Sequence, residues 1–315
     1  MTTTTTIGAS DPWPSLEGAN AGETRQTLFY WGQILGKTRL ALSPMVNHWW
    51  QAPFYVSARG LTTSSIPCGD FGFDMEIDLI SHRLVMRASH GAIESMDLGD
   101  GPLSELFRQY RARLNKLGVE LAIDPVAVEI PERVRFDEDA RICRYDRDWA
   151  NRFFRALVQV DQVFKAFRGE FVGKASPVHF FWGGFDLAAS RFSGRRAPPH
   201  PGGIPHVGDW VMREAYSHEV SSAGFWPGDA RFPEPAFYAY AYPEPDGFAK
   251  AAVRPAAARY DRALGEFLLP YAAVRSAPSP AADLRAFLDS TYAAAADLAR
   301  WDRAALERAS PQRER

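Results

Sequence analysis

The chain has 315 residues, and its 36 Lys and Arg against 38 Asp and Glu give a formal net charge of −2. This balance lacks the basic surface that displaces counterions from phosphates, so it argues against nucleic-acid binding. Two cysteines, Cys68 and Cys143, are too few for a disulfide framework. The sequence has neither a signal-peptide pattern at its start nor an apolar run that could cross a bilayer. We therefore expect a soluble, cytoplasmic protein without membrane partners.

Residues 13–130 carry the hydrophobic spacing of an α+β unit. Leu28, Trp31 and Leu35 lie three and four residues apart, which predicts a helix over residues 23–37. Strict alternation from Phe71 to Leu79 predicts the clearest strand, with one buried and one wet face. The same reasoning predicts further strands over residues 54–58, 84–88, 93–98 and 119–130 (the last interrupted at Pro125), and a helix over residues 103–117.

Residues 148–305 repeat this mixture of elements. Apolar residues from Phe153 to Phe171, spaced by three and four, predict a long buried helix over residues 149–171. Ser279 followed by Pro280 is typical of the start of a last helix. Strands are expected over residues 180–189, 214–220, 236–242 and 260–271.

These elements predict an α+β fold, mainly antiparallel sheet flanked by about four helices. The charged, proline-marked residues 131–147 are expected to connect a first half, residues 13–130, to a second half, residues 148–305. Residues 1–12 and 306–315 offer little apolar surface, so we expect a disordered N-terminus and a frayed tail.

The two halves resemble one another, which suggests an internal duplication. Ser43-Pro44 matches Ser176-Pro177, and His48-Trp49-Trp50 matches His179-Phe180-Phe181 at one spacing. A duplication predicts two related halves about a pseudo-twofold axis. Chance similarity within one α+β protein is the alternative.

Several long motifs resemble a bacterial family classed only as a domain of unknown function. The motifs are Val46 to Trp50, Ser176 to Gly183, Pro199 to Gly203 and Tyr216 to Gly228, and the resemblance covers nearly the whole chain. It implies a soluble bacterial protein and provides no catalytic residue. Any site must therefore be argued from side-chain chemistry.

Residues 173–245 concentrate the side chains that could form such a site. His179, His200 and His218 could act as acid, base or ligand near neutral pH, with Glu219 as a partner carboxylate. Asp186 and His206 lie in the same region, but the spacing matches no zinc signature. The alternative is that these histidines only shape the loops. A serine triad has weaker support, since no nucleophile-elbow motif is present.

Cationic and aromatic residues in this segment could bind a substrate. Arg191 and Arg195, together with Lys174, could hold a carboxylate or phosphate, although a solvated basic turn is the alternative. Aromatic side chains could form the pocket walls or could instead belong to the core: Trp182, Trp226 and Tyr240.

A further group of acids, Asp74, Glu76 and Asp78, shares one strand face. Three carboxylates at this spacing could bind a hard cation. Partnership with a cross-strand Arg83 or Arg87 on a solvated face is the favoured interpretation.

Two functional hypotheses follow. In the first, the protein is an enzyme that acts on a small polar or anionic metabolite, with His179, His200, His218 and Glu219 as catalytic groups. In the second, it is a non-catalytic ligand-binding or interaction module, in which aromatic residues dominate and histidines only shape loops. The sequence names no cofactor, metal, substrate or oligomeric state.

Overall fold

A computed structural model describes residues 11–229 and 232–309. The predicted disorder of residues 1–10 and 310–315 lies outside these ranges. Next to them, Asp11 accepts a hydrogen bond from Arg275, and Glu307 forms an isolated bridge with Phe171. No helix in the described part of the chain is long and apolar enough to cross a membrane.

The fold is α+β, as predicted, and its described residues form two six-stranded antiparallel sheets. In the first sheet the order is β1-β2-β4-β5-β6, and β3 pairs with β4. Its strands are β1 (Tyr55–Val56), β2 (Gly60–Thr62), β3 (Ile66–Cys68), β4 (Phe71–Asp78), β5 (Arg83–Ala88) and β6 (Ile93–Asp97).

The second sheet has the order β13-β14-β12-β11-β10-β9. Its strands are β9 (His179–Phe181), β10 (Asp186–Arg196), β11 (His218–Trp226), β12 (Ala236–Tyr242), β13 (Arg259–Asp261) and β14 (Glu266–Pro270). A two-stranded pair, β7 (Gly101–Pro102) with β8 (Ile142–Cys143), joins the N-terminal end of a helix to the connecting segment.

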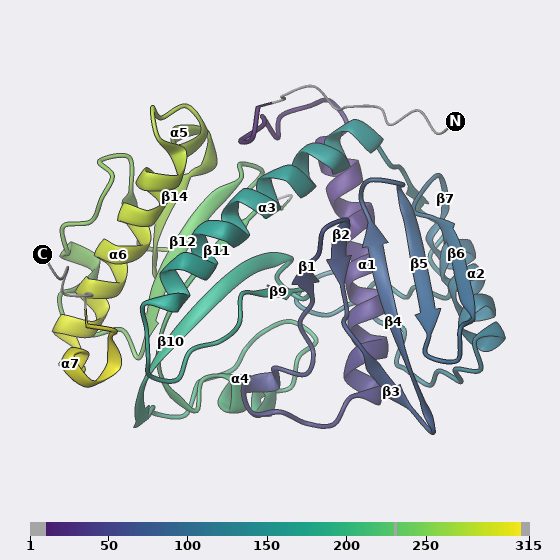
Figure 1. Ribbon diagram of the computed structural model, residues 1–315, viewed down its shortest axis with the longest axis horizontal. Helices are drawn as coiled ribbons and strands as arrows, with labels where there is room; N and C mark the ends of the chain where they lie inside the picture. The colour runs from purple at the N-terminus through teal and green to yellow at the C-terminus, as the bar shows by residue number, and fades with distance from the viewer. Residues whose placement is uncertain (1–10, 230–231, 310–315) are drawn as a thin grey trace, which may run out of the picture.

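Four long helices pack on these sheets, in agreement with the expected number. They are α1 (Ala21–Leu42), α2 (Leu103–Lys116), α3 (Arg147–Gly169) and α6 (Pro280–Leu298). Shorter turns complete the described chain: η1 (Asn47–Trp49), α4 (Asp209–Ala215), η2 (Phe248–Lys250), α5 (Tyr271–Arg275) and α7 (Arg303–Leu306). Figure 1 shows the β4–β6 sheet at one end of the molecule and α3 running across the β10–β14 sheet.

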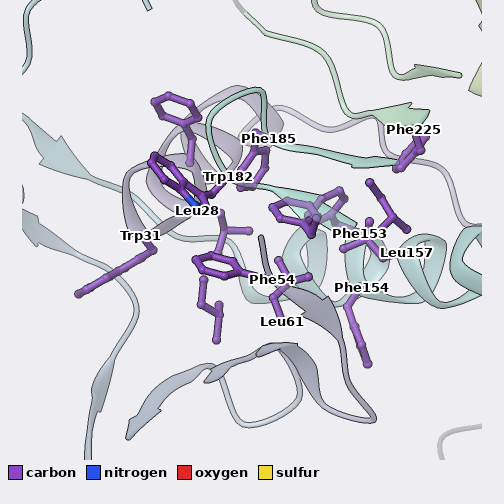
Figure 2. Close-up of a cluster of buried hydrophobic side chains, with 14 of the residues drawn as sticks. Leu28, Trp31, Phe54, Leu61, Phe153, Phe154, Leu157, Trp182, Phe185 and Phe225 are labelled. Carbon is purple, nitrogen blue, oxygen red and sulfur yellow. The ribbon is translucent and has the colours of Figure 1, made fainter. Parts of the chain in front are cut away.

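One continuous core joins the two halves. Phe54 and Phe180 exchange two backbone hydrogen bonds, of 2.9 and 2.8 Å, and so link the first half to β9. Figure 2 shows that α1, α3 and the β9–β10 turn all contribute to this core: Leu28, Trp31, Phe153, Leu157, Trp182 and Phe185. The site described below is therefore built on elements from both halves.

Four predicted strands differ from the structure. Residues 119–130 contain only an isolated bridge, Val126 to Arg135, because Pro125 and the following turns interrupt pairing. Residues 214–217 instead end α4, and β11 starts at His218. The stretches 180–189 and 260–271 are each a hairpin of two strands, which short turns containing Gly183-Gly184 and Gly265 allow.

The segments matched by the suggested duplication adopt different local structures. Asn47–Trp49 is a 3₁₀ turn in which His48 and Trp49 have φ of 59° and 62°. His179–Phe181 is instead an extended strand. The internal duplication therefore stays a prediction.

Candidate functional site

One face of the second sheet is polar, and it borders a cavity. Side chains alternate between the two faces of a strand. In β10, Asp186, Ala188 and Ser190 line the cavity, whereas Leu187 and Ala189 are buried in the core. Ser222 of β11 and Tyr240 of β12 are register partners that continue the cavity-lining face. Strand register thus places polar residues that are distant in sequence on one surface.

This central cavity has a volume of about 720 Å³. Aromatic side chains form much of its wall, including five of the nine tryptophans in the chain: Trp49, Trp50, Trp182, Trp210 and Trp226. Cavities of this size and lining are typical of small-molecule sites. The volume is large enough for a ligand of metabolite size.

Asp186 is the central acid of the cavity. Tyr238, on β12, donates a hydrogen bond to its carboxylate, and burial raises the pKa of Asp186 to about 6 despite that bond. Gly224 lies opposite Tyr238 in the ladder, and a Cβ there would stand 2.3 Å from the phenol ring. The glycine therefore lets the Tyr238 ring lie close over β11 and reach Asp186.

Glu129 approaches Asp186 from the loop before the second half. Two glycines of the β9–β10 turn make room for it. A Cβ on Gly183 would lie 1.8 Å from its Oε1, and one on Gly184 would lie 2.6 Å from Asp186 Oδ1 and 4.0 Å from Glu129 Oε2. Burial and the Asp186 carboxylate raise the pKa of Glu129 to about 7. The surface of Glu129 is exposed to the cavity, so the burial that raises its pKa is that of a group surrounded by protein but in contact with the cavity.

A buried glutamine fixes the backbone that carries Glu129. Gln33 of α1 is fully buried; it accepts from the Val128 N–H at 3.0 Å and donates to the Val128 carbonyl at 3.1 Å. Glu129 itself has φ of 65° and donates its N–H to the Pro205 carbonyl. Such a left-handed conformation is strained for a residue with a Cβ, and surrounding contacts hold it.

Glu266 and a tyrosine pair complete the polar lining. Glu266 begins β14, beside β12, and burial together with Asp186 raises its pKa to about 7. Tyr216 and Tyr240 share a hydrogen bond of 2.7 Å between their hydroxyls, and burial raises the pKa of Tyr240 to about 12. The tyrosines are thus neutral donors, while the acids titrate near neutral pH.

The turn η1 and the helix α4 cover one side of the cavity. Trp49 donates from Nε1 to the Val211 carbonyl at 2.9 Å, and its ring lies 5.2 Å from that of Trp210. His48 contacts the Ala215 carbonyl through Nδ1 at 3.0 Å and Lys174 through Nε2 at 2.8 Å. None of the α4 residues is buried, so these few contacts hold the cover in place.

Three of the residues predicted to bind substrate do line the cavity: Trp182, Trp226 and Tyr240. Trp182 also belongs to the core, since its Nε1 donates to the Ala52 carbonyl and it packs on α1. Both interpretations offered for it therefore hold. Tyr238, Tyr240 and Tyr242 occupy alternate positions of β12 and so lie on one face of the sheet.

His179 lies away from the cavity lining. It is fully buried against Trp50, Tyr55 and Phe181, and neither ring nitrogen has a hydrogen-bond partner among the described residues. Burial and the nearby arginines lower the pKa of His179 to about 3. It is a neutral core residue with no contact to a ligand-sized space.

The other predicted catalytic residues are spread around the second sheet. His200 stacks on Tyr216 at 4.8 Å, whereas His218 lies 5.7 Å from His48. Glu219, on the opposite face of β11, accepts from Ser193 and Arg195. The convergence of His179, His200 and His218 on one cavity, which the first hypothesis requires, is not found in the described structure.

The two predicted anion-binding arginines lie outside the cavity. Arg191 is buried on the opposite sheet face, where it donates to the Phe167 carbonyl and lies 3.5 Å from the centroid of the Phe167 ring. Arg195 pairs with Glu219 and donates to the Ala299 carbonyl. Alternation along β10 explains the position of Arg191, because the odd-numbered residues of this strand point away from the cavity and toward the helices.

The acids of β4 are paired, and the partner of two of them is the predicted Arg87, but the expected solvated face is wrong because Glu76 and Asp78 are buried. Arg87 contacts Asp74 at 2.9 Å and Glu76 at 2.7 Å, and Arg59 pairs with Asp78. Over the whole described chain, no three His, Cys, Asp or Glu side chains are grouped so as to hold a metal ion.

Sequence reasoning missed Glu129 and Glu266 as cavity residues. Glu129 sits in a loop without periodicity, and Glu266 precedes a short apolar strand, so no local pattern indicates either. The sequence prediction includes Asp186 only as an acid that lies in the same region as the candidate histidines. One sequence signal could have placed Asp186 on a polar face. That signal is the alternation of Asp186, Ala188 and Ser190 with the apolar Leu187 and Ala189.

The fold and the cavity together define an α+β protein with an acidic, aromatic-lined pocket. The chain belongs to a family of unknown function, DUF5996, whose family model matches residues 13–308. No curated protein and no solved structure matches the chain.

Proposed function

We propose that this protein is an enzyme that carries out general acid–base chemistry on a small polar molecule in the central cavity. The observation that supports this is the grouping of Asp186, Glu129 and Glu266 in one cavity, with pKa values of about 6, 7 and 7. Proton transfer is most efficient when the catalytic pKa lies near the working pH. Carboxyl groups shifted this way are typical of functional sites.

The environments of the carboxyls suggest different roles. Asp186 has the lowest pKa of the three and accepts from Tyr238, so it is mostly ionised at neutral pH and suits a base. Glu129 and Glu266 stay partly protonated there, so either can donate a proton. Paired groups whose environments separate their pKa values are how enzymes assign acid and base.

Aromatic walls would hold the substrate against these acids. Trp182 and Trp226 would contact its apolar faces, and Tyr240 would offer a hydroxyl. Arg191 and Arg195 are engaged elsewhere, so neither of the arginines predicted to bind an anionic group lines the cavity, whereas three carboxyl groups do. The lining therefore favours an uncharged or cationic polar molecule over the anionic metabolite of the first hypothesis.

A non-catalytic ligand-binding module is the second candidate. The five cavity tryptophans favour it, because aromatic rings bind flat or half-apolar ligands without any chemistry. In that case the carboxyl groups would only select ligands by their charge.

Mass spectrometry of small-molecule mixtures incubated with the purified protein separates the two candidates. Enzyme function predicts that some compounds are converted by the wild type and that Asp186→Asn lowers the rate by about 100-fold or more, as expected for loss of a general base. Glu219→Gln, an acid outside the cavity, should keep the rate. Compounds that bind but are always recovered unchanged would support the binding module instead.

We also propose a cytoplasmic location. Its support is that Cys68 and Cys143 are both free thiols, as expected in a reducing compartment. Cell fractionation tests this, and recovery outside the cytoplasm would contradict it.

A further inference from the structure

Three carboxyl groups of the cavity lack an ion-pair partner among the residues that the structure describes. Within residues 11–229 and 232–309, Glu129, Asp186 and Glu266 form no ion pair with Lys or Arg. Two cations do border the cavity, but Arg25 donates to the Pro227 and Pro233 carbonyls, and the acid that acts on the pKa of Lys37 is Asp124. Asp186 and Glu266 are half-buried, and carboxylates that are partly removed from water are stabilised by a cationic partner. This lining would therefore gain from a bound positive charge.

Aromatic faces surround the same acids. The Tyr238 and Tyr240 rings stand side by side at 6.0 Å with an interplanar angle of 16°, and both line the cavity. Trp182 and Trp226 contribute further rings. The face of an aromatic ring is negative and attracts cations. Rings and carboxylates thus select for the same ligand charge, by separate mechanisms.

Space for a small cationic group exists beside Asp186 and Glu129. The two carboxylates approach one another beside the β9–β10 turn, since a Cβ on Gly184 would lie 2.6 Å from Asp186 Oδ1 and 4.0 Å from Glu129 Oε2, and both side chains line the cavity. A nitrogen there could donate to both acids, since a protonated amine has several N–H donors that suit carboxylate oxygens. The 720 Å³ volume leaves room for the rest of such a ligand against the aromatic wall.

We propose that the ligand of this cavity is an organic amine, bound as its cation between Asp186 and Glu129, with its carbon skeleton against the tyrosine and tryptophan rings. The inference rests on the proposed function, because it concerns the same cavity, and it adds the chemical class of the substrate. It differs from the anionic metabolite expected from the sequence.

Binding of an amine cation should be coupled to the release of protons from the cavity carboxyl groups. A cation beside a carboxyl group favours its ionised form and so lowers its pKa. Because Glu129 and Glu266 are partly protonated near neutral pH, binding of an amine should release protons from them. An uncharged ligand of the same shape should release few or none.

Three compounds of one shape and different charge test the inference: benzylamine, benzyl alcohol and benzoate. Isothermal titration calorimetry at pH 6.5, in two buffers of different ionisation enthalpy, measures affinity and proton release together. We expect benzylamine to bind about tenfold or more tighter than benzyl alcohol, with net proton release, and benzoate to bind weakest. Tryptophan fluorescence provides a second readout, because five tryptophans line the cavity.

Matched variants assign the effect to the cavity acids. The affinity for benzylamine should fall by about tenfold in Glu129→Gln and in Asp186→Asn. The affinity for benzyl alcohol should stay within about twofold of the wild-type value in both variants. Glu219→Gln is the control, since it removes an acid from the opposite face of β11. Glu129→Gln keeps the Tyr238–Asp186 bond, so it remains informative if Asp186→Asn fails to fold.

Each other outcome has a definite meaning. Equal binding of amine and alcohol, insensitive to Glu129→Gln, overturns the amine inference and leaves acid–base chemistry on a neutral substrate in place. Tightest binding of benzoate overturns the inference and also restores the anionic class. If none of the three binds, the amine inference is rejected, while the conversion assay with compound mixtures still decides whether the protein is an enzyme.

Discussion

At the scale of single residues, burial decides which ionisable groups suit chemistry. His179 and Asp186 are seven residues apart, and burial disfavours the charged form of each, so it lowers the pKa of the histidine and raises that of the aspartate. The histidine is driven to its neutral form in an apolar environment. The carboxyl retains the Tyr238 donor and a border on the cavity, so it titrates near neutrality. Residue type alone would favour the histidine as the acid–base group. The environments of the two residues favour Asp186 instead.

His179→Leu should leave ligand binding and turnover intact. Both ring nitrogens are buried without partners, so an apolar side chain removes an unsatisfied group and should change the free energy of unfolding by about 1 kcal/mol or less, or stabilise the fold. The histidine must also gain a proton on acid unfolding, because its folded pKa of about 3 lies below the usual 6.5. Its contribution is therefore present above pH 6.5 and lost as the pH falls.

Urea unfolding at several pH values measures this change. The variant should lose less stability than the wild type between pH 6.5 and pH 4. An abolished activity in a variant that folds normally would instead support the catalytic role that the sequence suggested for His179.

Tyr238→Phe should raise the pKa of Asp186 above its value of about 6. The hydroxyl donates to the ionised carboxylate and so favours that form; removing the donor leaves burial unopposed. A pH–rate profile would show the acidic limb moving upward. Tyr242→Phe is the matched control on the same strand, because its hydroxyl donates to the Pro198 carbonyl. A limb that does not move would show that Asp186 is not the titrating base.

At the scale of elements, α1 and the β9–β10 turn position the site together. Gly36 of α1 faces the Trp182 ring, and Gln33, one turn earlier, holds the loop that carries Glu129. The helix thus fixes both an aromatic wall and an acid. The covering helix α4 has no buried residue and is held to η1 through His48 and Trp49.

Gly36→Ala tests this positioning by α1. A Cβ there would stand 2.2 Å from Trp182 Cδ2, so the ring must move, and we expect a loss of about 1–3 kcal/mol from overpacking. Ligand binding should weaken with it, and the tryptophan emission should shift. Gly22→Ala in the same helix has nothing within 4 Å and should stabilise by up to about 1 kcal/mol through helix propensity. Equal effects of the two changes in thermal unfolding would contradict the packing argument.

The elements also show what the sequence could predict. Alternation predicts β4 and β12, and the three-and-four spacing predicts α1, α2 and α3. The single buried face is found in α2 and α3, whereas α1 is buried on all sides in its middle and the end of β4 is buried on both faces. The cavity could not be predicted, since it depends on the register of four strands and on a loop acid. Glu129 reaches Asp186 only because Gly183 and Gly184 lack side chains, which no spacing rule reveals.

At the scale of the whole molecule, the acidic cavity should make stability depend on pH. The folded pKa values of Glu129, Asp186 and Glu266 lie above their usual values near 4, so the folded state holds these protons more tightly. Their contribution is full below pH 4 and is lost as the pH rises through about 6 to 7. Functional groups therefore weaken the fold at neutral pH, as is common for active sites.

The change Glu129→Gln should reduce the loss of stability that accompanies rising pH. We expect its free energy of unfolding to fall less than that of the wild type between pH 5 and pH 8, by on the order of 1 kcal/mol after allowing for water in the cavity. Chemical denaturation at fixed pH intervals gives the two curves. Parallel curves would show that Glu129 has an ordinary pKa in the folded protein.

Direct titration of the cavity carboxyls tests the account most closely. Carbon-13 NMR of carboxyl-labelled protein, with Asp186→Asn, Glu129→Gln and Glu266→Gln for assignment, reports each pKa in the folded state. We predict midpoints of about 6 for Asp186 and about 7 for Glu129 and Glu266. Midpoints near 4 for all three would contradict the acid–base cavity on which the proposed function rests.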